Sequence, residues 1–162
     1  MFLEKALDKA RTRVRESKAL RPLTSLTVSP LEEPHRFRDS LRRRKGEGIK
    51  LVAEVKRRSP SKGIIRDEVS VSRLARCYER GGAHALSILT EPFFFGGSLD
   101  DLAEARGSSR LPILRKDFII DEYQILESRE IGADAVLLIA AALDAARLAR
   151  LVELARELGM DP

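Results

Sequence analysis

Short apolar segments that alternate with amphipathic helices predict an α/β protein built on a parallel sheet. The segments with the length and the continuous apolar character of strands covered on both faces are 50–55, 85–89, 112–115 and 135–139. No glycine-rich GxGxxG follows the first of them, which disfavours a dinucleotide-binding sheet. The pattern therefore favours the TIM barrel, (β/α)8, of which the chain has the first four βα units, a half-barrel.

The chain begins with two predicted helices. Apolar residues recur at helical spacing in 2–16, namely Leu3, Leu7, Ala10 and Val14. A polar connection bounded by Pro22 and Pro30 follows, and Pro34 then fits the first turn of a helix that runs to about Lys45. We expect residues 1–47 to form an N-terminal helical extension and residues 48–162 to form the first half of the barrel.

Four further helices are expected between and after the strands, at 71–80, 99–106, 121–131 and 144–158. Asp121 and Asp144 stand where a side chain caps the start of a helix. Gly132 and Gly159 stand just past the ends of the same two helices, where glycine commonly terminates them. Each predicted strand is thus followed by a predicted helix.

Composition excludes several classes of protein. Hydrophobic residues make up 43% of the 162 residues and charged residues 34%, which suits a globular chain. The apolar runs are too short to span a bilayer, and the N-terminus has no continuous hydrophobic core of a secretory signal. The lone Cys77 cannot form an intramolecular disulfide. We therefore expect a cytoplasmic protein that has no membrane partner.

The net charge of +5 raises the alternative of a non-catalytic, basic nucleic-acid-binding fragment. The densest basic cluster lies on the second predicted helix and comprises Arg36, Arg38, Arg42, Arg43, Arg44 and Lys45. A solvated helical face explains such a run, and it contains no interleaved aromatic residues to stack on bases. We expect no nucleic-acid partner, because an anionic small molecule accounts equally for the charge.

Charged residues at the ends of two predicted strands are the candidates for chemistry. Period two places Glu54 and Lys56 on one face at the end of the first strand, where a structural ion pair is the alternative explanation. At the end of the third strand Lys116 shares a face with Phe118, and Arg115 and Asp117 share the opposite face. Functional groups of barrels gather at these strand ends, so we expect the two lysines and the carboxylate to converge on an anionic substrate.

The loop after the second strand contains three consecutive phenylalanines, Phe93, Phe94 and Phe95, followed by two glycines. Three such residues in one loop cannot all belong to the core. They predict either an apolar wall for an aromatic substrate or packing of the loop on a helix.

Four ordered motifs, AEVKRRSPSKG (53–63), SILTEPFFFGGS (87–98), PILRKDFIIDEYQI (112–125) and GADAVLLIAAAL (132–143), resemble those of indole-3-glycerol-phosphate synthase. The resemblance covers essentially the whole chain and implies a lyase of tryptophan biosynthesis. Such an enzyme converts 1-(2-carboxyphenylamino)-1-deoxyribulose 5-phosphate into indole-3-glycerol phosphate, carbon dioxide and water.

The resemblance also implies roles for individual residues. Lys116 resembles the general acid that protonates the ketone of the substrate, Lys56 the lysine that binds the anionic ends of the substrate, and Glu54 the carboxylate that orients that lysine. The positions that resemble the substrate-binding pocket are Ser87, Leu89, Phe95, Phe118, Leu137 and Pro60. The implied substrate is an anthranilate-derived sugar phosphate, and no metal or organic cofactor is implied.

The family continues beyond the matched motifs with a second catalytic glutamate and a phosphate site. We therefore expect this chain alone to be inactive and to self-associate through the open edges of the half-barrel, with Val52, Leu89 and Leu137 uncovered. A related barrel, phosphoribosylanthranilate isomerase, is the nearest alternative. It would need an acid–base pair of Cys and Asp near the strand ends, whereas Cys77 falls within a predicted helix, where we expect it to be packed.

Overall fold

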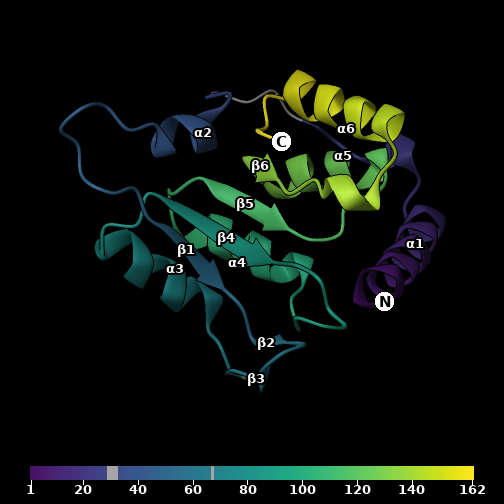
Figure 1. Ribbon diagram of the computed structural model, residues 1–162, viewed down its shortest axis with the longest axis horizontal. Coiled ribbons are helices and arrows are strands. Elements are labelled where there is room, and N and C mark those ends of the chain that lie inside the picture. Colours follow the sequence, from purple (N-terminus) through teal and green to yellow (C-terminus); the bar gives the residue numbers. More distant parts are fainter. Residues whose placement is uncertain (29–32, 67) are drawn as a thin grey trace.

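The computed structural model describes residues 1–28, 33–66 and 68–162 and contains a parallel sheet covered by helices (Figure 1). Its strands are, in spatial order, β1 (Val52–Val55), β4 (Ala85–Leu89), β5 (Ile113–Lys116) and β6 (Ala135–Val136). All neighbouring strands are parallel, so the predicted α/β class is confirmed. β6 ends earlier than expected, although the amide of Leu137 still donates to the carbonyl of Arg115 at 3.2 Å.

The predicted helices that alternate with these strands are confirmed. They are α3 (Val71–Arg80), α4 (Leu99–Ser108), α5 (Glu122–Ile131) and α6 (Ala145–Glu157). The side chain of Asp121 accepts a hydrogen bond from the amide of Tyr123 and that of Asp144 from the amide of Arg147, which caps two otherwise unsatisfied helix starts. Gly132 ends α5 at φ 97°, a conformation that strongly favours glycine.

The main core lies between the sheet and α3–α6. Ala53 and Val55 point from β1 into it, together with Leu86, Ile88, Leu102, Ile113, Ile125, Val136, Leu151 and Met160. Val52, on the opposite face of β1, is 39% exposed. Leu89 is only 4% exposed, so the expectation that this residue would be uncovered is wrong.

The N-terminal segment forms α1 (Phe2–Leu20), the short helix η1 (Leu23–Ser25) and α2 (Arg36–Leu41). α1 lies at one side of the sheet beside α5 (Figure 1). The second helix was predicted to reach Lys45. This prediction is wrong, because α2 ends at Leu41 and the backbone is extended at Arg42. Most of the basic cluster thus follows α2 rather than lying on it. Pro30, the end of the predicted connection, lies outside the described residues.

Three short features were not predicted: the helical turn η1, a hairpin of β2 (Arg58–Ser59) and β3 (Gly63–Ile64), and the helical turn η2 (Ala140–Ala142). The hairpin extends beyond the end of β1 (Figure 1). In the described part of the chain, no helix combines the length and the apolar character needed to cross a membrane.

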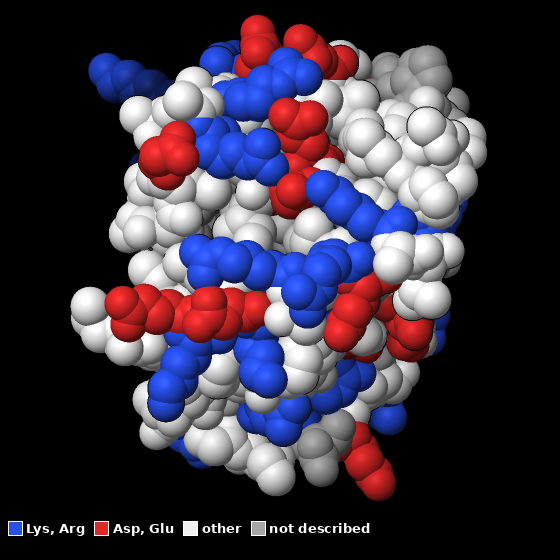
Figure 2. Space-filling model, turned by 90° about the vertical axis from the view of Figure 1, so that its right-hand side faces the viewer, with Lys and Arg blue, Asp and Glu red and all other residues white. Residues whose placement is uncertain are grey.

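Basic and acidic side chains alternate on the face shown in Figure 2. Lys18 of α1 forms an ion pair with Asp121, the N-cap residue of α5. Arg21, which directly follows α1, forms one with Glu130 of α5. The charges on this face are therefore interspersed and do not form a continuous basic stripe.

Candidate active site

The structure brings together the three charged side chains singled out at the strand ends. The Nζ atom of Lys56 donates to Oε1 of Glu54 at 2.7 Å, and the Nζ atom of Lys116 donates to Oε2 at 2.5 Å. β4 lies between β1 and β5, so Lys116 reaches Glu54 across the face of the intervening strand. Two ammonium groups from separate strands thus share one carboxylate.

The electrostatics of this cluster favour an anion. Burial alone would raise the pKa of Glu54, but the hydrogen bonds and charges of Lys116 and Lys56 outweigh it, and the pKa lies below its ordinary value. With Glu54 ionised and both lysines protonated, the cluster has a net positive charge. All three side chains remain partly exposed, so a ligand can reach them.

Two predicted pocket residues lie on β4 between the charged strands. Ser87 pairs in register with Glu54, and Leu89 pairs with Lys116, which places each beside a charged residue. The hydroxyl of Ser87 is buried and has no hydrogen-bond partner within the described residues. A buried hydroxyl without a partner is costly, and a ligand oxygen at this position would satisfy it. Leu137 is partly buried just after β6.

The phenylalanine loop packs against α1. The ring of Phe2 makes edge contacts with Phe94, Phe95 and Phe118, with centroids 5.0, 6.5 and 6.2 Å away. Ala6, Leu7 and Ala10 of α1 complete this apolar cluster. Phe93 is exposed, and Nζ of Lys9 lies 4.8 Å from its ring centroid. Packing of the loop on a helix, one of the two predicted explanations, is therefore confirmed.

Sequence reasoning missed the residue that shapes this loop. Glu91, two residues after the end of β4, is buried and accepts hydrogen bonds from the backbone amides of Phe93, Phe94 and Phe95 at 3.0, 2.6 and 3.1 Å. The loop closes at Gly97, where a Cβ atom would lie 2.0 Å from the carbonyl oxygen of Leu89. An acidic residue that follows an apolar strand was the available signal.

The structure also places Pro60 and Cys77, two further residues for which the sequence led to an expectation. Pro60 lies exposed in the turn of the β2–β3 hairpin, apart from the cluster that the hydrogen bonds define. Cys77 lies on α3 as expected but is exposed, so the prediction that it packs in the core is wrong. Among the described residues, no group of three or more His, Cys, Asp or Glu side chains is placed to hold a metal ion.

Comparison with known proteins agrees with the motifs. A family model described as indole-3-glycerol phosphate synthase matches residues 3–162. The chain is 51% identical to indole-3-glycerol phosphate synthase 2 of Streptomyces coelicolor, with 89% of the chain and 55% of the relative covered. It is 43% identical to the synthase of Campylobacter hominis and 45% identical to that of Dehalococcoides mccartyi, with 99% of the chain and 63% of each relative covered.

Proposed function

Because the chain belongs to the indole-3-glycerol phosphate synthase family, we propose that it provides the catalytic lysines of that synthase. The reaction closes the indole ring of 1-(2-carboxyphenylamino)-1-deoxyribulose 5-phosphate with loss of carbon dioxide and water. The observation that carries the proposal is the convergence of Lys56 and Lys116 on Glu54. An anionic substrate whose ketone becomes an alkoxide needs both a fixed positive charge and a proton donor.

Each member of the cluster has a separate task. The ammonium group of Lys116 donates a proton to the ketone oxygen while the ring carbon attacks the carbonyl carbon. Lys56 binds the carboxylate that later leaves as carbon dioxide. Glu54 holds the two ammonium groups on its two oxygens, which fixes their separation before the substrate arrives.

The apolar surroundings suit the anthranilate ring. We propose that the ring is bound beside the lysines by Ser87, Leu89, Phe95, Phe118, Leu137 and Pro60. Because Pro60 stands on the exposed hairpin, its contact requires the hairpin to fold over the bound substrate. The chemistry needs only acid–base groups, so no cofactor takes part in the proposal, and the expected location is the cytoplasm.

The chain spans 55 to 63% of the length of these three relatives. We propose that residues 1–47 form the N-terminal extension and that residues 48–162 form the first four βα units of a TIM barrel. Catalysis by this arrangement needs the remaining units, so the 162-residue polypeptide alone is expected to form no product.

Ligand-dependent thermal unfolding of the 162-residue chain tests the proposal. We expect indole-3-glycerol phosphate to raise the melting temperature, because a ligand that binds only the folded state stabilises it. The rise should disappear in Lys116→Met and persist in Lys45→Met, which removes an exposed lysine after α2. Stabilisation by an oligonucleotide, and none by indole-3-glycerol phosphate, would instead favour the basic nucleic-acid-binding alternative.

The open face of the sheet leads to a prediction about association. Val52 is 39% exposed on the face of β1 that also bears Glu54, and within the described residues the outer edge of β1 pairs with no other strand. An exposed apolar side chain beside an open strand edge favours association. At the other edge, Asp161 is the one residue of the described ranges that forms a bridge to Ala135 of β6. We expect sedimentation velocity to show concentration-dependent oligomers of the 162-residue chain.

Two variants locate the contact. Val52→Lys should shift the protein towards monomer, whereas Leu20→Lys, at the exposed end of α1, should leave the oligomers unchanged. A compact monomer at every concentration, with one cooperative melting transition, would contradict this prediction.

A further inference from the structure

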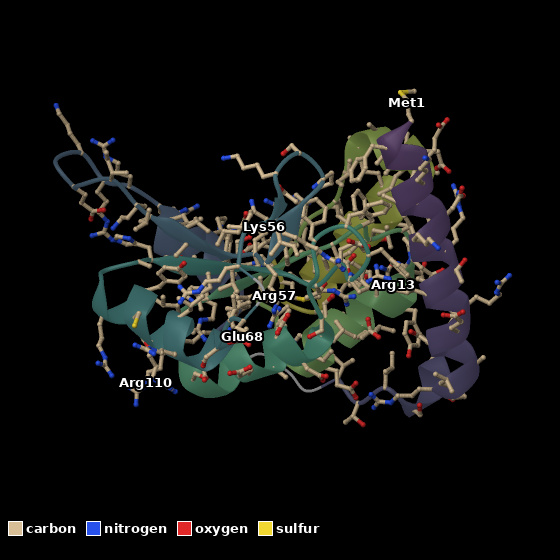
Figure 3. All side chains as sticks on the ribbon, turned by 90° about the horizontal axis from the view of Figure 1, so that it is seen from below. Met1, Arg13, Lys56, Arg57, Glu68 and Arg110 are labelled. Atoms are coloured by element: carbon tan, nitrogen blue, oxygen red, sulfur yellow. The ribbon has the colours of Figure 1, made fainter. Side chains whose placement is uncertain are left out.

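One arginine of α1 reaches the end of the sheet next to the lysine cluster. The Nη2 atom of Arg13 donates to Oδ1 of Asp117 at 2.7 Å, and its Nη1 atom donates to Oδ2 at 3.1 Å. Nη1 also lies 3.4 Å from the carbonyl oxygen of Thr90. Figure 3 shows the side chain of Arg13 pointing from α1 towards the sheet. A single guanidinium thus joins α1 to the ends of both β4 and β5.

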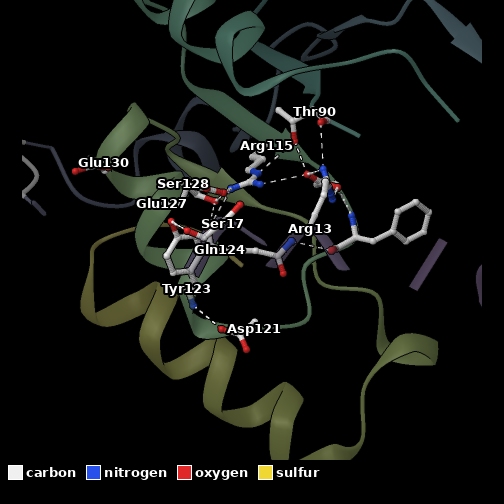
Figure 4. A network of polar contacts seen from close by, with 12 residues as sticks. Arg13, Ser17, Thr90, Arg115, Asp121, Tyr123, Gln124, Glu127, Ser128 and Glu130 are labelled. Atoms are coloured by element: carbon white, nitrogen blue, oxygen red, sulfur yellow. Dashed lines mark hydrogen bonds and ion pairs between the residues drawn. The ribbon is translucent and has the colours of Figure 1, made fainter. Parts of the chain in front are cut away.

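Asp117 is the shared acceptor in this arrangement, and Figure 4 shows three of its donors, Arg13, Thr90 and Arg115, close together. Its side chain is fully buried and accepts three more hydrogen bonds, from the hydroxyl of Thr90 at 2.7 Å, from Nη2 of Arg115 at 3.2 Å and from the amide of Phe118 at 2.8 Å. Burial would raise the pKa of Asp117, but the two arginines and the hydrogen bonds lower it to about 2. The carboxylate therefore stays ionised and keeps all of these donors in place.

The residues on either side of Asp117 belong to the proposed active site. Lys116 precedes it and points to the opposite face of the strand, where it contacts Glu54. Phe118 follows it and packs on Phe2 of α1. Rotation of the backbone at Asp117 would therefore move the proton donor and a wall of the ring pocket together.

Arg13 and Arg115 differ in what they hold. Arg115 also binds Glu127, Ser128 and the carbonyl of Gln124 on α5, so it joins the strand to the core. The hydrogen bonds described for Arg13 reach only Asp117 and Thr90. Its removal should consequently disturb the strand ends more than the packing of α5.

We propose that Arg13 is a positioning residue: through Asp117 it fixes Lys116 for proton transfer and Phe118 for ring binding. α1 then contributes a positioning residue to the active site, in addition to covering the phenylalanine loop. This inference rests on the proposed function, because its catalytic consequence is the placement of the proposed proton donor.

Turnover is the first readout, measured in a protein of full family length that contains this sequence. Arg13→Ala should lower kcat about tenfold and change KM by less than about twofold, because misplacement of a proton donor affects the chemical step. Arg15→Ala removes the same charge from an exposed position of α1 and should have no effect. Arg13→Lys keeps one charged donor and should recover part of the lost kcat.

Chemical rescue separates positioning from a general loss of structure. The side chain of Arg13 is 21% exposed, so its removal leaves a space that ethylguanidinium can enter. Low millimolar ethylguanidinium should raise kcat of Arg13→Ala and leave the wild type and Arg15→Ala unchanged. A normal kcat in folded Arg13→Ala would overturn the inference. A loss of kcat that merely parallels a fall in the melting temperature would overturn it as well.

A second readout does not depend on turnover. Reductive ¹³C-methylation gives the lysines of the 162-residue chain NMR signals, and Lys116→Arg identifies that of Lys116. This signal should shift in Arg13→Ala, return towards its wild-type position with ethylguanidinium, and stay in place in Arg15→Ala. If the Lys116 signal shifts in Arg13→Ala but neither the wild type nor any variant turns over the substrate, the proposed synthase function is rejected. The positioning of Lys116 by Arg13 would still hold. A Lys116 signal that does not change in Arg13→Ala would overturn the inference.

Discussion

Replacing Lys116 by methionine is expected to lower turnover by a factor on the order of 10² or more, the usual contribution of a general acid. Methionine approximates the length of lysine but has neither a proton to donate nor a charge to stabilise the developing alkoxide. Product formation in a single turnover should be measured in a protein of full family length that contains this sequence, so that product release does not mask the chemical step.

Matched variants define the specificity of this effect. Lys45→Met removes an exposed lysine after α2 and should leave turnover unchanged. Glu54→Gln should reduce turnover less than Lys116→Met, because both lysines remain although the amide nitrogen of glutamine faces an ammonium group. Turnover of Lys116→Met within a few-fold of the wild type would rule out the role of Lys116 as the proton donor.

The strands of the sheet and the helices that cover it could be predicted because their sequence signals are local. Period two and continuous apolar character gave β1, β4 and β5, and capping aspartates gave the starts of α5 and α6. The end of α2 could not be placed, since helix propensity continues through the basic run after Leu41 while like charges at adjacent turns oppose it. The two-residue strands of the β2–β3 hairpin are too short to show any period.

The candidate site was predictable to the extent that it depends on strand alternation. Alternation alone put Glu54 and Lys56 on one face, and the parallel order brought Lys116 to the same edge. The contact of Arg13 with Asp117 joins residues 104 positions apart and depends on how α1 docks. Its one sequence signal was a pair of charges, Arg115 and Asp117, on the strand face that helices cover.

That buried pair of charges leads to the largest expected effect on stability. Asp117→Asn removes the anion from between Arg13 and Arg115 and leaves two guanidinium groups without their shared partner. Loss of one partner from a buried ion pair typically costs about 3–5 kcal/mol. Urea unfolding at neutral pH should show a free energy of unfolding lower by this amount. Asp8→Asn, which removes an exposed partner of Arg11, should change it little.

The difference between the wild type and Asp117→Asn should depend on pH. The pKa of Asp117 falls from 3.8 to about 2 on folding, and one pKa unit corresponds to about 1.4 kcal/mol. Ionised Asp117 therefore contributes about 2 kcal/mol of stability above pH 3.8, and this contribution is lost as the pH falls through about 2. Repeating the urea titrations from pH 6 to pH 2 should narrow the difference by about 2 kcal/mol, because all other carboxylates are common to both proteins. A difference that stays constant over this range would show that Asp117 is not held as an anion by Arg13 and Arg115.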